Sequence, residues 1–170
     1  MRTHIAPLAL AAALLISCGG QSVPFRQPAR ATTLHLDESD DEILRIALNA
    51  RNTLNVFFRH LNTPDAGERN FSVKYALPVD DGGSVDVEQI WIGNIGFRDG
   101  GFYGTVASTP VYLTSLERGD RVGFSAEAVT DWMFTRNGRI VGGYSIRYLL
   151  ERIPEDERSD GQRRTLLMFD

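Results

Sequence analysis

Two carboxylates stand beside tryptophans in this sequence: Glu88 precedes Trp91 by three residues, and Asp131 directly precedes Trp132. A carboxylate among apolar rings can have a raised pKa, which suits it to act as a general acid or base. If both carboxylates faced one cleft, about 5 to 9.5 Å apart, they could work as the paired carboxylates of glycosidases do. The pair therefore supports one function hypothesis, a carboxylate-based hydrolase or transferase.

The same side chains could instead form a surface that binds a ligand or a partner without chemistry. The residues of this candidate surface are Glu88, Trp91, Asp131, Trp132, Tyr144 and Arg147. Lys74 and Arg147 are the candidate counter-charges for the two carboxylates. The structural alternative is that both tryptophans pack in the core or at an edge, while Asp131 caps a turn with Arg147 as its partner. We assign no catalytic residue.

Several other chemistries lack the residues they need. After position 17, histidine occurs only at His35 and His60, and cysteine only at Cys18. A catalytic triad, a histidine or thiolate metal site and a disulfide framework are therefore not expected. The sequence has no phosphate-binding loop and no dinucleotide fingerprint, so we expect no cofactor. A net charge of −4 without a basic run gives no footprint for nucleic acid.

The N-terminus has the pattern of a secretion signal. Arg2 and His4 precede the apolar run 5–16, which is shorter than the roughly 20 residues a membrane span needs. Leu15-Ile-Ser-Cys18 resembles a bacterial lipobox, which implies cleavage after residue 17 and attachment of fatty acyl chains such as palmitate to Cys18. The alternatives are an ordinary secreted protein with an unpaired cysteine and a cytosolic chain with an apolar tail.

A lipidated cysteine would make the membrane the first partner, because several acyl chains on one residue give stable anchoring. Gly19 is not the aspartate that often retains lipoproteins at the inner membrane, so we expect the cell envelope, at the outer membrane facing the periplasm. Residues 18–37 then form the lipidated cysteine and a flexible tether, with prolines and small polar residues.

One long amphipathic helix is expected at residues 40–61. Ser39 and Glu42 have the spacing of a capping box, and apolar residues then recur with helical period to Leu61. Its apolar stripe suits packing on the protein's own sheet better than membrane contact, because the polar face is not strongly cationic.

Strands should follow the helix. Alternation of apolar and polar residues predicts a strand at 71–77 and a second strand that continues to about Ile95. In the second strand, Val85 and Val87 are out of phase with the later isoleucines, which predicts a bulge near Glu88-Gln89. Asp99-Gly100-Gly101 and Asn137-Gly138 predict two hairpins. Gly104 should allow a close approach, and residues 126–129 are either a helical turn or an extended link.

The C-terminal part should contain a short helix through Ile146, Leu149, Leu150 and Ile153, ended by Pro154. Residues 155–164 are interpreted as a solvated linker, and residues 165–169 as an added strand or anchor. The predicted class is α+β: a long N-terminal amphipathic helix packed on a bent, mostly antiparallel sheet, with a short C-terminal helix. The expected parts are a signal peptide (1–17), the tether (18–37), one domain (38–154) and a charged tail (155–170).

The segment from about Phe71 to Leu149 resembles the DUF2314 (YegJ-like) family of bacterial proteins. The matching pieces are Phe71–Lys74, Glu88–Trp91, Phe102–Gly104, Pro110, Gly119-Asp120, Asp131–Met133 and Gly142–Arg147. Two departures are Gln89, where the family often has histidine, and Ser108-Thr109 before the proline. The family has no assigned function, so the resemblance implies no catalytic residues.

Three function classes follow. The first is an envelope-anchored, non-catalytic binding or interaction module for a protein or a cell-wall partner. The second is the carboxylate-based hydrolase or transferase, acting on an envelope polymer. The third is an immunity-like inhibitor that captures a toxin, which the acidic net charge would suit.

Overall fold

The computed structural model describes residues 41–79 and 87–169. The described helices are α1 (Asp41–Asn52), α2 (Leu54–Asn62), α3 (Tyr144–Arg152) and α4 (Asp160–Leu166), with 3-10 turns η1 (Ala126–Ala128) and η2 (Glu155–Glu157). The described strands are β1 (Glu68–Pro78), β2 (Val87–Arg98), β3 (Gly101–Val106), β4 (Arg121–Phe124), β5 (Val129–Arg136) and β6 (Arg139–Gly142). The expected signal peptide, Cys18, the tether, Ser39 and Val85 lie outside the described residues.

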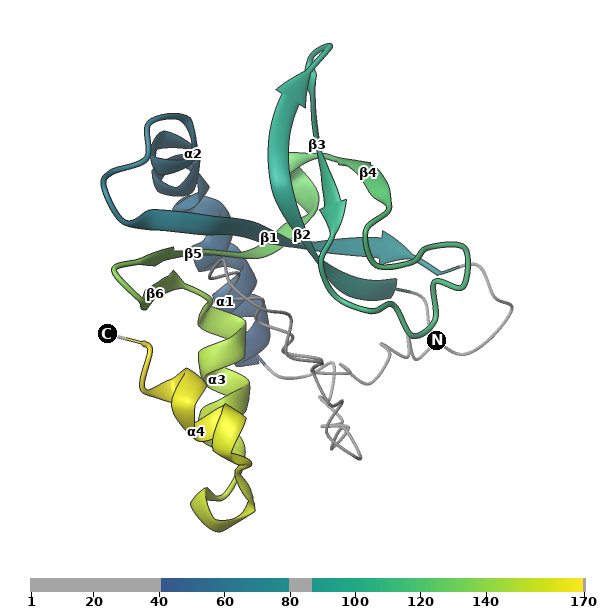
Figure 1. Cartoon of the computed structure of the whole chain (residues 1–170). Helices are drawn as coiled ribbons and strands as arrows, with labels where there is room; N and C mark the ends of the chain where they lie inside the picture. Colours follow the sequence, from purple (N-terminus) through teal and green to yellow (C-terminus); the bar gives the residue numbers. More distant parts are fainter. Residues whose placement is uncertain (1–40, 80–86, 170) are drawn as a thin grey trace, which may run out of the picture.

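The six strands form one sheet in the order β4-β3-β2-β1-β5-β6, and all neighbouring strands are antiparallel. The α+β class and the antiparallel sheet are therefore confirmed. Figure 1 shows the β2–β3 hairpin rising away from the part of the sheet that contains β5 and β6. Both predicted hairpins are present: Arg98 pairs with Gly101, and Arg136 pairs with Arg139. Residues 126–128 form η1, the helical alternative.

The single helix expected at 40–61 is wrong, because the structure has two helices with a break at Thr53. The indole N–H of Trp132 donates to the carbonyl of Ala50 at 3.1 Å and to Thr53 Oγ1 at 3.1 Å. Thr53 Oγ1 also donates to the carbonyl of Asn49 at 2.7 Å. Side chains that bind helix carbonyls in this way interrupt the i to i−4 ladder. The break in the helix therefore lies at the contact with Trp132, which is 79 positions after Thr53 in the chain.

The bulge predicted near Glu88-Gln89 is also wrong. The β1–β2 pairing is regular from Pro78↔Val87 to Ser72↔Gly93, and Glu88 occupies the same face as the fully buried Ile90 and Ile92. The alternation of apolar residues is broken at Glu88 because a carboxylate, and not an apolar side chain, occupies this core-facing position. The irregularity in β2 lies further on, between Gly93 and Gly96 in its pairing with β3.

The two faces of the sheet carry separate apolar clusters. On the first face, Trp132 and Phe134 of β5 pack with Ala50, Leu54 and Phe57 of α1 and α2. On the second face, Met133 and Trp91 pack against Ile146 and Leu150 of α3, together with Leu166 and Phe169. Alternate residues of β5 therefore serve opposite cores, as strand geometry requires.

The glycines at 142 and 143 place α3 directly after β6. Gly142 has φ +78°, and a Cβ there would lie 2.3 Å from the carbonyl oxygen of Trp132. Only glycine fits this position without moving the backbone. Gly104 confirms the expected close approach, since a Cβ there would lie 2.6 Å from the Gly93 carbonyl oxygen.

The C-terminal segment is folded onto the domain. Residues 155–164, expected as a solvated linker, are largely exposed but contain η2 and most of α4. Ser159 and Gln162 form a capping box that starts α4. Thr165 and Leu166, expected to begin an added strand or anchor, belong to α4 instead, and only Phe169 makes an isolated parallel bridge with Ile140.

None of the helices within 41–79 and 87–169 combines the length and apolar character needed to cross a bilayer.

Candidate functional site

Asp131 and Lys74 face each other across β5 and β1, and both side chains are buried on the second face of the sheet. Asp131 Oδ2 accepts the backbone N–H of Ser145 at 2.8 Å and its hydroxyl at 2.6 Å. Asp131 Oδ1 accepts the N–H groups of Trp132 at 2.8 Å and Tyr144 at 3.3 Å. The N-cap residue of α3, Gly143, has no side chain, so a strand carboxylate caps this helix.

Lys74 completes the network. Its ammonium donates to Ser145 Oγ at 3.2 Å and lies 5.9 Å from the centre of the Trp91 ring. Burial lowers the pKa of Lys74 to about 8, while the charge of Asp131 acts in the opposite direction. Burial also raises the pKa of Asp131, against the hydrogen bonds from Ser145 and the charge of Lys74. The Ser145 hydroxyl links the two charges, so its proton and its lone pair are both engaged.

Glu88 is held by a loop instead of a cation. Its Oε1 accepts the N–H of Val111 at 2.6 Å, and its Oε2 accepts those of Tyr112 and Leu113, each at 2.9 Å. Three backbone donors on one carboxylate explain why the charge can lie in a core-facing position. Glu88 thereby fixes the loop between β3 and β4 against the sheet.

The remaining members of the predicted surface are also dispersed. Trp132 is buried in the first core, where its ring packs edge-to-face against Tyr144 at 5.7 Å. Trp91 packs against the apolar cluster on the second face of the sheet. Arg147 is exposed on α3 and pairs with Glu151 at 2.8 Å.

The six candidate residues therefore do not share one surface. Glu88 lies on the face of Ile90 and Ile92, whereas Asp131 lies on the face of Lys74 and contacts α3. Two carboxylates on opposite faces cannot flank one bond, so the hydrolase or transferase built on this pair is wrong. The structural alternative holds for Trp132 and Asp131, with Lys74 rather than Arg147 as the counter-charge.

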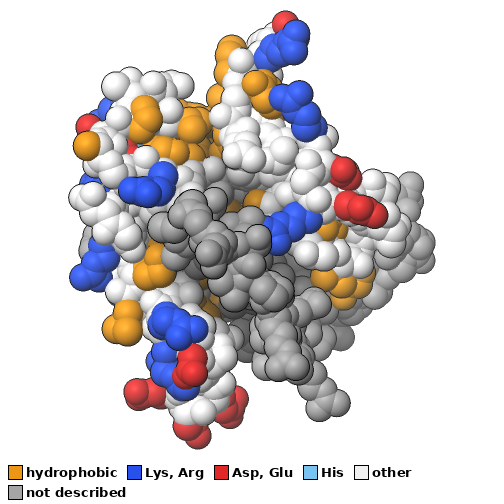
Figure 2. Space-filling model, in the orientation of Figure 1, with side chains coloured by type: hydrophobic (Ala, Val, Ile, Leu, Met, Phe, Trp, Pro, Cys, Tyr) orange, Lys and Arg blue, Asp and Glu red, His pale blue; other side chains and the backbone are white. Residues whose placement is uncertain are grey.

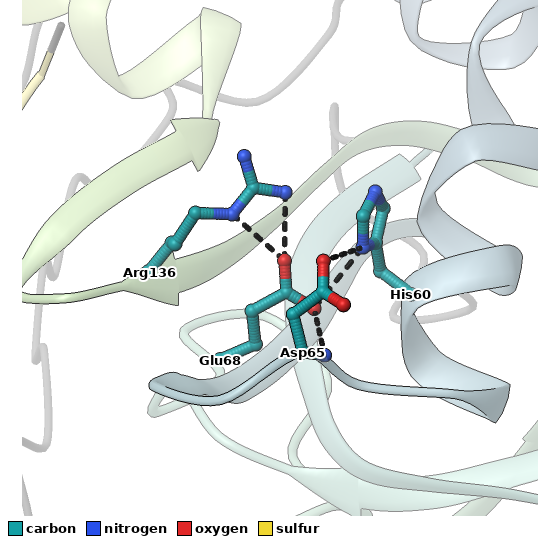
Figure 3. Close-up of polar contacts among 4 residues, drawn as sticks. All are labelled: His60, Asp65, Glu68 and Arg136. Atoms are coloured by element: carbon teal, nitrogen blue, oxygen red, sulfur yellow. Dashed lines mark hydrogen bonds and ion pairs between the residues drawn. The ribbon is translucent and has the colours of Figure 1, made fainter.

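A second polar cluster joins α2, β1 and β5 (Figure 3). His60 Nδ1 lies 3.0 Å from Glu68 Oε2 and 3.8 Å from Asp65 Oδ2, and these ligand-type atoms all fall within 4.8 Å of one another. Arg136 binds Glu68 Oε1 through Nε at 2.8 Å and Nη2 at 2.7 Å. A divalent cation could use the His60, Asp65 and Glu68 atoms, but the charge of Glu68 is already balanced by Arg136. The polar contacts of this cluster therefore hold α2, β1 and β5 together.

A cavity of about 540 Å³ opens where β1 and β2 separate. Its lining includes Asn70 and Ser72 of β1, Thr105 of β3, and Trp91, Gly93, Asn94 and Ile95 of β2. It also includes Arg118, Met133 and Ile146. Trp91 is the one member of the predicted surface in this lining, which does not include Lys74, Asp131 or Ser145. Figure 2 shows the β2–β3 hairpin projecting from the body of the molecule, apart from the lobe that carries α2.

The sequence pattern does not single out the two asparagines of this cavity, because it predicts Asn94 as part of an ordinary strand. Asn70 and Asn94 have φ +58° and +49°, which is the left-handed region. Asparagine tolerates that region better than other residues with a side chain, and it is depleted in regular strands. An asparagine inside an alternating apolar run was therefore the available signal.

The comparisons with known proteins agree with one another. Residues 40–168 match the family model described as an uncharacterised protein conserved in bacteria, DUF2314. The uncharacterised protein YegJ of Escherichia coli (strain K12) is 32% identical over 112 residues, 66% of this chain and 69% of YegJ.

A Neisseria meningitidis serogroup B protein with an ankyrin repeat protein name is 28% identical over 130 residues, which is 74% of this chain. The match spans about half (51%) of that longer relative. No solved structure matches. Because the family match covers both ends of the described fold, from α1 to the residues after α4, this chain belongs to the DUF2314 family of uncharacterised bacterial proteins.

Proposed function

We propose that this protein is a lipid-anchored envelope protein whose folded part is a non-catalytic binding module, with the cavity between β1 and β2 as its binding site. One observation supports the proposal above all: the cavity lining has side chains suited to binding, whereas the buried carboxylates have structural roles. The cavity lining contains apolar side chains, small polar side chains and Arg118. Glu88 and Asp131, the carboxylates on which a catalytic interpretation depended, instead hold a loop and a helix in place.

A pocket with apolar walls and a few convergent polar groups is the usual form of a ligand site. Trp91, Met133 and Ile146 supply apolar surface, while Ser72, Thr105 and the asparagines supply hydrogen-bonding groups. Such a lining supports recognition of a ligand with both polar and apolar parts. The envelope partner would be a protein or a cell-wall component; nucleic acid is not proposed.

The binding site can be tested in intact cells of the native bacterium. A photo-crosslinking amino acid at position 105 reports on the cavity, and the same amino acid at the exposed Ala66, outside the lining, is the matched control. We expect adducts from position 105 that disappear when Ala107→Phe adds bulk to the lining. Equal adducts from both positions, or adducts that survive Ala107→Phe in a folded protein, contradict the proposed site.

The anchor requires a separate experiment. Cells fed an alkyne-bearing fatty acid should label the wild-type protein, and Cys18→Ser should abolish both labelling and sedimentation with membranes. The proposed localisation is the outer membrane, facing the periplasm. Labelling that persists in Cys18→Ser, or a wild-type protein without label, contradicts the lipid anchor.

A further inference from the structure

The sheet divides into two arms at Ser72 and Gly93. The β1–β2 pairing ends with this residue pair. Before Ser72, β1 pairs only with β5, through Glu68↔Arg136 and Arg69↔Thr135. After Gly93, β2 pairs only with β3, from Gly96↔Tyr103 to Arg98↔Gly101. We call the gap between the two arms the fork. Within the described sheet, the edges of residues 68–71 and 94–98 that face it have no strand partner.

Two asparagines hold the fork open in equivalent ways. Asn70 and Asn94 both have positive φ, and each lies at a register shift that turns its strand away from the other. The carboxamide of Asn70 donates to Thr135 Oγ1 of β5 at 3.1 Å. The carboxamide of Asn94 donates to Thr105 Oγ1 of β3 at 2.9 Å. Each strand is thus fastened to its outer neighbour at the point where it leaves the inner one.

The cavity lies at this fork, since its lining includes both asparagines and both threonines. Backbone N–H and C=O groups need hydrogen-bond partners, and an extended peptide supplies them in the same geometry as a strand. We propose that the fork binds an extended peptide segment of a partner protein, which pairs with the open edges of β1 and β2. This inference rests on the proposed binding function and names its ligand class.

The charge of the lining adds a preference. Arg118 is exposed, and the described lining residues include no Asp or Glu. Trp91, Ala107 and Arg118 line the same cavity as the fork residues Asn70 and Asn94. A peptide with a carboxylate at the end that reaches Arg118 is therefore favoured over the same peptide without one.

The test uses the full chain with Cys18→Ser and a defined probe, an eight-residue peptide of alternating threonine and valine with a free C-terminal carboxylate. Binding is followed by NMR. We expect shifts, and slower amide exchange, at residues 70–71 and 94–97. Methylation of alternate peptide nitrogens, which removes backbone donors, should weaken binding at least about tenfold.

Two further arms test the contribution of Arg118. Arg118→Gln should weaken binding of the free-carboxylate peptide by about threefold, the size of one exposed ion pair, and should not change binding of the C-terminally amidated peptide. Arg59→Gln is the matched control, because Arg59 is exposed on α2 outside the cavity. Equal effects of the two substitutions contradict the role of Arg118.

The inference is overturned if the N-methylated peptide binds equally well, if the shifts lie away from the fork, or if no member of the peptide set binds. These results leave the proposed binding function standing when position 105 still gives adducts in cells. Loss of those adducts would instead remove the binding site itself, so the two failures are distinguishable.

Discussion

The carboxylate of Asp131 accepts both the backbone N–H and the hydroxyl of Ser145, at 2.8 and 2.6 Å, so strand β5 provides the N-terminal cap of helix α3. The contact joins two elements that the glycine pair 142–143 brings together after the β5–β6 hairpin. Asp131, one of the two candidate carboxylates, therefore has a structural role.

Asp131→Asn should destabilise the protein by about 3 kcal/mol, because it leaves the Lys74 ammonium buried without its counter-charge. The measurement is urea unfolding of the purified protein. The double variant with Lys74→Met should lose less stability than the sum of the two single variants, since both act on one pair. Asp99→Asn, an exposed carboxylate in the β2–β3 turn, is the control and should stay within about 0.5 kcal/mol of wild type. Additive effects of the two buried substitutions would show that the pair is not coupled.

Lys74 should titrate near pH 8 in the native protein. It is the one lysine of the chain, so ¹³C-labelled lysine gives a single Cε signal to follow by NMR. Burial lowers its pKa from 10.5 to about 8, so between these values the unfolded chain binds a proton that the native chain has released. The free energy of unfolding should therefore rise by about 3 kcal/mol from pH 8 to 10.5 through this group. Lys74→Met should lack that rise; an unchanged pH profile would contradict the prediction.

Glu88→Gln should loosen the loop between β3 and β4. A carboxamide offers one acceptor oxygen where the carboxylate now binds Val111, Tyr112 and Leu113, so at least one of these three backbone donors loses its partner. We expect a loss of about 1 to 3 kcal/mol and faster hydrogen exchange at these three amides. Glu117→Gln, on the exposed part of the same loop, is the comparison, and similar exchange in both variants would argue against this role of Glu88.

Glu68 should make stability sensitive to acid. Burial acts to raise the pKa of Glu68, but hydrogen bonds from the Asp65 backbone, Arg136 and His60 outweigh it, so the pKa lies below the ordinary 4.5. A lowered carboxyl pKa stabilises the native state above pH 4.5, and that contribution disappears as pH falls through the native pKa. Wild type should therefore lose more stability below pH 4.5 than Glu68→Gln does. Parallel acid unfolding curves for the two proteins would contradict the prediction.

Local patterns predicted much of the framework. The α+β class, the antiparallel sheet, the two hairpins and the helix after Gly142-Gly143 depend on apolar period and turn residues, which act over a few neighbouring positions. The resemblance to the DUF2314 family, which the family match confirms, could also be predicted, because it depends on the order of short motifs along the chain.

The candidate surface could not be predicted in this way. The position of Glu88 is set by N–H groups about 23 to 25 residues further on, and the helix break at Thr53 by an indole 79 residues away. When the two faces of a strand are assigned from apolar side chains alone, a carboxylate such as Glu88 is not expected on the core-facing side. In the structure Glu88 does lie on that side, because backbone N–H groups bind it there.

The sequence by itself determined the kinds of elements, the turns that join them and the family. Only the tertiary structure decided which face each carboxylate occupies, which cation Asp131 meets, and where β1 and β2 part. Those outcomes depend on contacts between residues far apart in the chain, and the free energy of burying a polar group is set by the partner it finds there. For the same reason the fork, fastened by Asn70 and Asn94 to threonines on two other strands, became visible only in the folded chain.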